Sequence, residues 1–595
     1  MVQKIRINTL CEGLLKDWSE KLLTLQISHS DETGLYGGIL CPACARIHGR
    51  CFEAIYPFLY LADTHHDLRF LDAAKRLFEW AEQTVSRPDG SYVNDMDCDW
   101  QGTTVFSALQ LAEALTFHGH ILDGDTRQIW MARLDKAAKF LYHFEELNNN
   151  NINYCITNAL TMLYCGELLN IPEYKAYARN NIQKALDHMP GDSFLFGEGY
   201  PTDGRTPRGC RAVDIGYNVE ESLPALAACS TIIGDTELEN RVTQSFETHL
   251  HAFLPDGGWN NSFGTRNYKW TYWGSRTSDG SAFGLLLLAN HNPAFAQAAY
   301  ANLQLLRQCT HGGLLYGGPH YHAAGERACV HHTFTHAKVL ADILNHELSL
   351  PESSMPSMVS GNEGIQHFAD IDSYFINCHG MLASITANDW EYISGGHASG
   401  GNITMLWHHA AGPILCASVS QYLTEEPPNM QLPRFAFHEC ISPALKYEED
   451  GICFTSLYDF DCVMSHQDIP GEYTVHVLGQ LPKINHVLPA KPVTHESRYI
   501  FQKDSLRFET GVSDSRVYYQ CPLISKAGEF AVLTGNQLVI RKELAEIILT
   551  VEHGQLLLPH GLERCYNLVP GLQAIKAVIV SEDMQICFNL KVNKL

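Results

Sequence analysis

Two hydrophobic patterns alternate over the first 350 residues, and both predict helices. In the first pattern only one helical face is apolar, as in residues 68–84, where Leu71, Leu77 and Phe78 share a face. This pattern covers residues 10–26, 68–84, 127–144, 172–188, 236–253 and 294–309. The second pattern is apolar on nearly every side, which is typical of interior helices. It covers residues 46–62, 102–118, 153–169, 215–231, 279–290 and 331–347. We therefore expect six outer and six inner helices.

The two patterns repeat together as a helix pair. The inner helices begin at intervals of roughly 50 to 65 residues, which is the spacing of a repeated two-helix unit. Six units that close on themselves form an (α/α)6 toroid, and an open solenoid is the alternative. We favour closure for residues 1–350, because neither end of this region carries a polar capping face.

The pattern changes after a Pro/Ser/Gly-rich linker at residues 351–364. Short runs rich in β-branched and aromatic residues follow, several of them alternating and separated by turn residues, which predicts antiparallel strands. We expect an antiparallel β-sandwich over residues 365–595. The predicted class is mainly α with a β domain.

The loops before the inner helices are long and rich in Gly, Trp, Tyr, Asp, Arg and His, whereas the loops after them are short. All the long loops must lie at one end of a toroid, where catalytic groups are commonly placed on a rigid scaffold. The richest are residues 196–223 and 256–280. Asp214 stands as a helix cap at the end of the first loop. We expect the functional site at this end.

Carboxylates at the starts of neighbouring inner helices predict acid–base chemistry. Asp279 and Glu221 are our candidates for general acid and base in glycoside cleavage, with Asp214 in reserve. The alternative is a solvated network of surface charges.

Basic and aromatic residues in the same loops predict recognition of an acidic sugar. Arg208, Arg211 and Arg276 can each offer a bidentate fork to a uronate carboxylate, and Trp273 can stack on a sugar ring. The alternative is that these aromatic residues are buried and hold the loop in place.

A second constellation suggests β-elimination, which needs no carboxylate pair. Asn153 could neutralise a uronate carboxylate while a tyrosine or histidine moves protons. Candidate partners in the predicted loops and inner helices are Tyr154, Tyr217, His320, His331 and His397. Helix packing is the alternative for the histidines.

Two groups of cysteines and histidines have spacings that could support metal binding or thiol chemistry. Cys41, Cys44, His48 and Cys51 resemble half of a zinc site and could instead host a reactive thiolate. His332 and His336 are spaced to share a metal on one helix face, but no third ligand accompanies them at motif spacing. We favour structural packing, and expect no metal and no cofactor.

Composition narrows the class of partner. A net charge of −24 disfavours nucleic acid and anionic membranes. No apolar run is long enough to span a membrane, and the N-terminus lacks the apolar segment of an export signal. The 19 cysteines show no framework spacing, so we expect reduced thiols and a cytoplasmic location. A homo-oligomer is expected for an enzyme of this size.

The order of domains, with an Asn-Tyr inner helix and histidine-bearing loops, resembles heparinase II/III-like and alginate-lyase-like enzymes. Those lyases often carry an HAHAD-like segment, for which this chain has GGHASGGNITMLW (395–407), with Ser399 and Gly401 where metal ligands would be. The segments CPACARIHGRC, VDIGYNVEESLPAL and KWTYWGSRTSDG are more similar to β-glucuronidases of glycoside hydrolase family 154.

The second resemblance implies an exo-acting hydrolase that removes a terminal β-linked glucuronic acid from oligosaccharides, and this is our main functional expectation. The alternative is a uronic-acid lyase on the same scaffold, and a non-catalytic glycan-binding protein is the third possibility. A lyase product carries a C4–C5 double bond that absorbs in the ultraviolet, which separates the first two readings.

Overall fold

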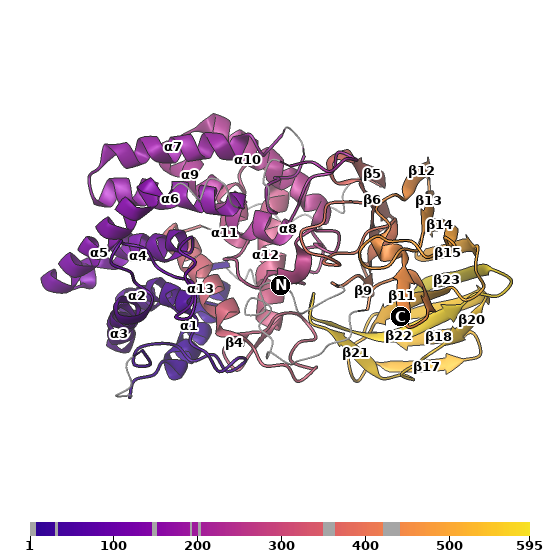
Figure 1. Cartoon of the computed structure of the whole chain (residues 1–595). Helices are drawn as coiled ribbons and strands as arrows, with labels where there is room; N and C mark the ends of the chain where they lie inside the picture. Colours follow the sequence, from indigo (N-terminus) through magenta and orange to yellow (C-terminus); the bar gives the residue numbers. More distant parts are fainter. Residues whose placement is uncertain are drawn as a thin grey trace.

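The computed structural model describes residues 7–29, 34–144, 151–190, 193–199, 204–348, 363–419 and 441–595. A helical domain is followed by a β domain, drawn in indigo to magenta and in orange to yellow in Figure 1. This confirms the predicted fold class. The predicted linker, 351–364, lies outside the described residues apart from its last two positions. No helix in the described ranges combines the length and apolar character needed to cross a membrane.

The helical domain contains the two predicted sets of helices. The outer helices are α1 (Ile7–Leu25), α3 (Leu68–Thr84), α5 (Gly124–His143), α7 (Pro172–Leu186), α10 (Thr236–His249) and α12 (Pro293–Gln308). The inner helices are α2 (Ile55–Thr64), α4 (Thr104–His118), α6 (Ile152–Leu168), α8 (Ile215–Tyr217) with α9 (Leu223–Ile233), α11 (Ala282–Leu287) and α13 (Val330–Asn345).

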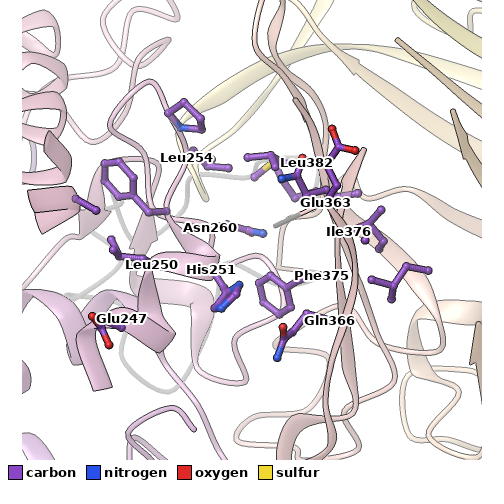
Figure 2. A pocket seen from close by; sticks show the side chains of 18 of the residues that line it. Glu247, Leu250, His251, Leu254, Asn260, Glu363, Gln366, Phe375, Ile376 and Leu382 are labelled. Atoms are coloured by element: carbon purple, nitrogen blue, oxygen red, sulfur yellow. The ribbon is translucent and has the colours of Figure 1, made fainter. Parts of the chain in front are cut away.

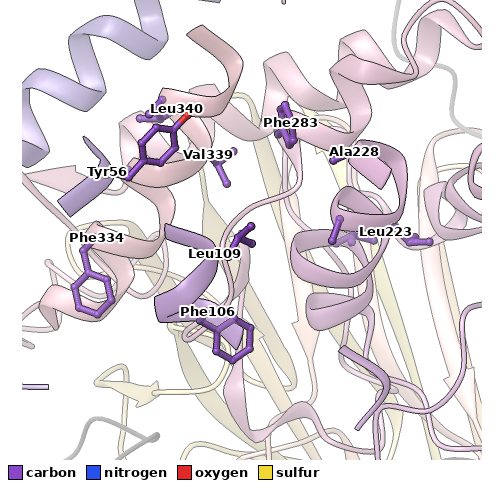
Figure 3. Packing of buried hydrophobic residues seen from close by; sticks show 14 of the residues in the cluster. Tyr56, Phe106, Leu109, Leu223, Ala228, Phe283, Phe334, Val339 and Leu340 are labelled. Carbon is purple, nitrogen blue, oxygen red and sulfur yellow. The ribbon is translucent and has the colours of Figure 1, made fainter. Parts of the chain in front are cut away.

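The inner helices form a closed ring. Each contacts the next along the series α2, α4, α6, α9, α11 and α13, and α13 returns to contact α2 and α1. Figure 3 shows Phe106, Leu223, Phe283 and Val339, which come from different inner helices, directed toward a shared interior. Closure follows from burial, because a helix that is apolar on every side needs neighbours on every side.

The fourth inner helix is interrupted, which the sequence pattern did not predict. A π turn over Asn218–Ser222 separates α8 from α9. Pro224 has no backbone N–H to donate to the carbonyl of Glu220, which accepts instead from the N–H of Gly280 at 3.0 Å. Such π turns often occur at functional sites, and this one sets the positions of Glu220 and Glu221.

The β domain consists of two antiparallel sheets. In the described residues the first sheet has the order β11-β10-β16-β9-β8-β7-β6-β5, with β22 joined to β16 and carrying β20 and β21. Its strands are β5 (Gly364–Phe368), β6 (Ser373–Cys378), β7 (Met381–Thr386), β8 (Asn402–His408), β9 (Gly412–Cys416), β10 (Ala444–Glu449), β11 (Ile452–Thr455), β16 (Tyr518–Ile524), β20 (Gln555–Leu557), β21 (Arg564–Asn567) and β22 (Leu572–Val580).

The second sheet has the order β12-β13-β14-β15-β23-β19-β18-β17. Its strands are β12 (Val463–Ile469), β13 (Glu472–Gln480), β14 (Thr494–Gln502), β15 (Ser505–Val512), β17 (Phe530–Thr534), β18 (Gln537–Arg541), β19 (Ala545–His553) and β23 (Gln585–Lys594). Alternation is clear in β14, where buried and exposed residues follow each other. The buried face packs into a core shared with the first sheet.

Apolar and polar contacts join the two domains. Phe194 and Phe263 of the helical domain pack against Phe375 of β6, with ring centroids 6.2 and 4.9 Å away. Asp256 accepts hydrogen bonds from Trp407 at 3.0 Å and from Tyr272 at 2.7 Å. The core of the toroid therefore continues into the first sheet, which fixes the β domain against one end of the ring.

Candidate active site

The loops that precede the inner helices lie against the β domain. Tyr272 and His320 donate backbone hydrogen bonds to Pro570 and Gly571, at 2.9 and 3.1 Å. The β domain therefore covers the loop end of the toroid, and residues from both domains can contribute to a site there.

One group of side chains gathers at this end, and we call it the mouth cluster: Asn153, Tyr154, Tyr217, Lys269 and His331. The start of α6 supplies the first two. The backbone N–H of Asn153 donates to Glu198 at 3.0 Å, which fixes the helix start against the loop at 193–199. The indole of Trp100 donates to the hydroxyl of Tyr154 at 3.3 Å.

Tyr217 is positioned by a helix cap and by two polar contacts. Asp214 accepts from the backbone N–H of Tyr217 at 3.3 Å, which confirms it as the predicted cap. The ammonium group of Lys269 lies 3.2 Å from the Tyr217 hydroxyl. That hydroxyl also shares a short hydrogen bond with Thr277. A cation at this distance stabilises negative charge on the phenol oxygen.

Lys269 is carried by a rigid hairpin. The pair β1 (Trp270–Thr271) and β2 (Gly274–Ser275) follows it directly. Glu220 holds this hairpin by accepting from the N–H of Ser275 at 2.7 Å and from the hydroxyl of Ser278 at 2.8 Å. A side chain at Gly274 would collide with Glu220, since a Cβ there would lie 1.8 Å from its carboxyl oxygen.

Buried charges surround the mouth cluster. Glu198 is fully buried and pairs with Arg266 at 3.2 Å, and burial raises the pKa of this carboxyl to about 8. The guanidinium of Arg266 lies over the ring of Tyr217, 4.8 Å from its centroid. Burial also raises the pKa of Tyr154 to about 12. Tyr154 is therefore a neutral phenol that can donate a proton at neutral pH.

Two polar atoms in the mouth cluster lack hydrogen-bond partners among the described residues. They are Oδ1 of Asn153 and Nε2 of His331. The pKa of His331 lies well below its usual range, because burial and then the Arg50 guanidinium disfavour the charged ring. Buried polar atoms are nearly always paired, so atoms left unpaired mark a place where a ligand can bind.

Aromatic rings give the mouth cluster a partly open rim. Trp100 and Tyr154 are half-buried, as is Tyr392 in the loop after β7. Tyr392 stacks on Tyr268 with centroids 6.1 Å apart, and Arg266 lies 5.5 Å from its ring. The rim combines apolar ring faces with polar groups, as a sugar-binding site requires.

The predicted catalytic carboxylates lie deeper, in a second group that we call the deep cluster: Glu113, Glu220, Glu221, Asp279, Lys338 and Asp342. They line a cavity of about 20 Å³. Such a cavity holds about one water molecule and cannot hold a sugar ring. This geometry argues against Asp279 and Glu221 as the acid–base pair, and Asp214 acts as a helix cap.

Charges in the deep cluster face one another rather than a cleft. Lys338 donates to Asp279 at 2.8 Å and lies 3.9 Å from Glu113. Burial, followed by repulsion from Asp279, raises the pKa of Glu221 well above its usual range, and the neighbouring Arg50 and Asn153 act in the opposite direction. Glu221 thus lies beside the Asn153 amide and is placed to orient it.

The predicted uronate-binding arginines bind the β domain instead. Arg208 pairs with Asp372 at 2.6 Å, and the backbone N–H of Arg211 donates to the Asp370 carbonyl at 2.7 Å. Arg276 is fully buried and donates to the carbonyl of Leu568. Interdomain contacts therefore hold the side chains of Arg208 and Arg276 and the backbone of Arg211, whose Nε lies 3.9 Å from the Asp370 carboxyl.

Trp273 is fully buried, and its indole donates to the carbonyl of Tyr316 at 2.8 Å. It therefore offers no exposed face to a sugar. This agrees with the alternative interpretation, in which buried aromatic residues hold the loop in place.

Two predicted histidines also bind the protein itself. His320 accepts from the backbone N–H of Gln573 at 2.9 Å, at the contact between the domains. His397 lies 3.2 Å from the carbonyl of Asn388 and shapes the loop that carries Tyr392. The described contacts place neither histidine in the mouth cluster, which contains Asn153, Tyr154, Tyr217 and His331 of the predicted residues.

Several residues of the site were not selected from the sequence: Trp100, Glu198, Arg266, Lys269 and Tyr392. The available signal was the position of Lys269 between two aromatic residues in the loop at 256–280. Nothing local distinguishes Lys269 from Arg276 in that loop, since only the fold decides which one faces the mouth.

A larger groove lies elsewhere between the domains (Figure 2). It has a volume of about 410 Å³ and runs between the end of α10 and strands β5 to β8. His251, Asn260 and Phe375 face it from the two sides (Figure 2). Within the described residues, none of the side chains predicted for catalysis or binding lines this groove.

Comparison with known proteins covers both domains. The model of the ulvan lyase N-terminal domain matches residues 15–360, and that of the ulvan lyase C-terminal domain matches residues 365–594. A broad-specificity ulvan lyase of Formosa agariphila is 34% identical over 588 residues, covering 96% of this chain and 92% of that protein.

Solved structures share the architecture at low identity. The chondroitin AC lyase of Streptomyces coelicolor matches with a TM-score of 0.53 at 12% identity, covering 98% of this chain and 79% of that chain. A heparan sulfate lyase of Pedobacter heparinus gives a TM-score of 0.49 at 9% identity, with 98% and 83% covered. At 12% identity the first likeness is evidence for the fold alone.

These matches correct the functional expectation. The main reading, a β-glucuronidase-like glycoside hydrolase, is wrong, because the relative that aligns along nearly the whole chain is a lyase. The resemblance to glycoside hydrolase family 154 gains no support from them. The lyase alternative, together with the heparinase-like resemblance, agrees with both matched domains.

Proposed function

The chain belongs to the two-domain ulvan lyase family, and from this premise we propose that it cleaves a uronate-containing polysaccharide by β-elimination. The observation that carries the proposal is the contact of Lys269 with the Tyr217 hydroxyl, beside an inner helix that begins with Asn153 and Tyr154. This arrangement supplies the groups that elimination needs without a pair of carboxylates in an open cleft.

The reaction requires three functions. The uronate carboxylate must be neutralised, so that the C5–H bond becomes acidic. A base then removes the C5 proton, the electron pair forms the C4–C5 double bond, and the C4–O bond breaks. An acid gives a proton to the departing oxygen. The products are a shortened chain and an unsaturated uronate.

Each function has a candidate in the mouth cluster. Asn153 is the candidate for the neutralising group, and its amide lies beside Glu221. Its Oδ1, which lacks a partner among the described residues, can accept a hydrogen bond from the protonated, uncharged form of the uronate carboxyl. Tyr217 is the base, because Lys269 stabilises its phenolate. Tyr154 is the acid, because burial keeps it protonated at neutral pH.

The substrate class follows from the family and from the cations at the mouth. Ulvan, or a polysaccharide with similar uronate units, is the proposed substrate, on the model of the relative from Formosa agariphila. Arg50, Arg266 and Lys269 provide positive charge near the cluster. Assembly into a homo-oligomer and a cytoplasmic location stay predictions.

The test is incubation of the purified protein with ulvan, chondroitin sulfate and 4-nitrophenyl β-D-glucuronide, each followed by ultraviolet absorbance. We expect an unsaturated-uronate band to grow with ulvan while the glucuronide releases no nitrophenol. Nitrophenol release without an unsaturated product would contradict the proposal. Reducing ends that appear on ulvan without the ultraviolet band would contradict it as well, since hydrolysis leaves no double bond.

A further inference from the structure

Four metal-binding side chains meet where the ring of helices closes. Cys41, Cys44 and His48 lie in the loop before α2, and Cys329 is the residue just before α13. Cys41 and Cys329 are fully buried, His48 is 7% exposed, and Cys44 is partly exposed. Three of these residues are close together in the sequence, whereas Cys329 lies 288 residues after Cys41.

Their separations are those of ligands around one ion. The Sγ atoms of Cys41 and Cys329 are 3.6 Å apart. Nε2 of His48 lies 3.3 Å from Sγ of Cys44 and 3.5 Å from Sγ of Cys329. A tetrahedral zinc ion with bonds of about 2.3 Å to sulfur and 2.0–2.1 Å to nitrogen separates its ligands by about 3.5–3.8 Å. These three distances lie close to the edges of such a tetrahedron, and the donor atoms of Cys41, Cys44 and His48 all lie within 4.8 Å of one another.

A carboxylate lies near the second nitrogen of His48, beyond direct hydrogen-bond distance. Nδ1 of His48 lies 3.8 Å from a carboxyl oxygen of Asp95. The same oxygen accepts a hydrogen bond from the N–H of Gly49 at 3.1 Å, which fixes its position. A carboxylate behind a ligating histidine fixes the ring so that the other nitrogen faces the ion.

A disulfide and simple packing explain the cluster less well. A disulfide requires sulfurs about 2.05 Å apart, and the pair Cys41–Cys329 is at 3.6 Å. Packing of buried thiols explains a single contact, but not three donors grouped within 4.8 Å of one another together with a fourth, Cys329, that contacts both Cys41 and His48. Cys51, the fourth member of the group predicted from the sequence, is fully buried and is not among the three residues whose donor atoms are grouped in the described structure.

We propose that Cys41, Cys44, His48 and Cys329 bind one zinc ion as a closed Cys₃His site. All four positions around the ion are filled by protein, so the site has a structural role and leaves no place for substrate. It ties the loop before the first inner helix to the start of the last one, and so fastens the ring at its closure.

The site also bears on the mouth cluster. Cys329 lies two residues before His331, and the rings of His48 and His331 are 5.7 Å apart. A metal that fixes Cys329 and His48 therefore fixes the backbone from which the side chain of His331 extends. This gives the ion a positioning role for the cluster, although it takes no part in the elimination.

The first test measures metal in the full-length protein purified without chelator from zinc-supplemented culture. We expect roughly one zinc per chain by inductively coupled plasma mass spectrometry, and less than about a tenth of that in Cys44→Ser and Cys329→Ser. Cys51→Ala is the matched control, a buried thiol three residues from His48, and it should keep the metal.

The second test does not depend on a variant that folds. Cobalt exchanged into the wild-type protein should give an intense thiolate-to-metal band in the near ultraviolet and visible absorption typical of tetrahedral coordination. Removal of zinc with a strong chelator should lower the midpoint of thermal unfolding by several degrees.

Three outcomes would overturn the proposal. One is wild-type protein that holds no zinc and gives no cobalt–thiolate band. Another is zinc content in Cys44→Ser and Cys329→Ser equal to that of Cys51→Ala. The third is a Cys41–Cys329 disulfide, found by mass spectrometry, in metal-free protein. None of these readouts uses catalysis, so they stand apart from the test of the lyase proposal.

Discussion

The mouth cluster and the deep cluster are built on the same inner helices, and both are rich in buried titratable groups. They differ in space and in partners. The deep cluster surrounds a cavity of about 20 Å³, where Lys338 lies among acids that face inward. Both clusters contain polar atoms that lack hydrogen-bond partners among the described residues, but the mouth cluster also has half-buried aromatic rings at its rim.

The comparison shows that charge density by itself does not mark an active site. In the deep cluster the positive charge of Lys338 is paired with the acids around it, as in other ion pairs inside proteins. In the mouth cluster a cation lies against a phenol, which prepares that phenol for proton transfer. A cation placed against a phenol, near half-buried aromatic rings, is the better criterion.

The largest expected effect separates the two clusters by activity. Tyr217→Phe should lower kcat on ulvan by roughly 10²–10⁴-fold, because it removes the proposed base, while the unfolding midpoint changes little. Asp279→Asn should leave kcat of the folded protein within about tenfold of wild type, because no sugar reaches the deep cavity. Initial rates and thermal unfolding on both variants provide the measurement.

The reverse result would exchange the roles of the clusters. If folded Asp279→Asn lost turnover while Tyr217→Phe stayed active, the catalytic role would belong to the carboxylates of the deep cluster.

A smaller effect sharpens the role of the cation. Lys269→Met should lower kcat about 10–100-fold and move the rising limb of the pH–rate profile to higher pH, since the phenolate loses its neighbouring positive charge. Lys338→Met is the matched control, because it removes a buried lysine from the deep cluster. Its profile should keep the wild-type limb. A profile for Lys269→Met that falls equally at every pH would show that Lys269 only supports the structure.

The smallest effect concerns stability against pH. Burial raises the pKa of Asp342 to about 7, above the usual value of about 3.9. Between these values the folded protein holds a proton that the unfolded chain has released, so the group makes stability fall as pH rises. Asp342→Asn should reduce this decline between about pH 4 and pH 7, by at most about 1.4 kcal/mol per pH unit.

Urea unfolding at several pH values measures this decline. The pKa of Glu198, near the mouth cluster, is raised to about 8. Its contribution to the fall of stability with rising pH therefore continues about one pH unit further than that of Asp342. Glu198→Gln should therefore change the slope up to about pH 8. Equal slopes in wild type and Asp342→Asn would show that Asp342 is ionised throughout.

The sequence predicted the scaffold well because its signals are local. The 3.6-residue period, the apolar inner helices and the Asp214 cap each depend on residues a few positions apart. The Asn-Tyr start of the third inner helix was also recognisable, and it lies in the mouth cluster. The break at Pro224 was missed, because its effect depends on a carbonyl that turns to Gly280 in another loop.

The assignment of side chains to roles was predicted poorly. Arg208 and Lys269 both occupy loops at the right end of the toroid, but one pairs with Asp372 and the other reaches Tyr217. Trp273 was predicted to stack on a sugar ring, but its side chain is fully buried. These outcomes depend on contacts between segments far apart in the chain, which no local pattern encodes.

The sequence by itself determined that helix pairs repeat, that a β-sandwich follows, and that the long loops precede the inner helices. It favoured a closed ring over an open solenoid, and the contacts of α13 with α1 and α2 decided for the ring. Tertiary structure alone decided which of the many charged loop residues face a ligand. It also brought Cys329 to Cys41, Cys44 and His48 across 288 residues. The physical reason is that periodicity and capping act within one or two turns, whereas pairing and burial depend on where distant segments meet.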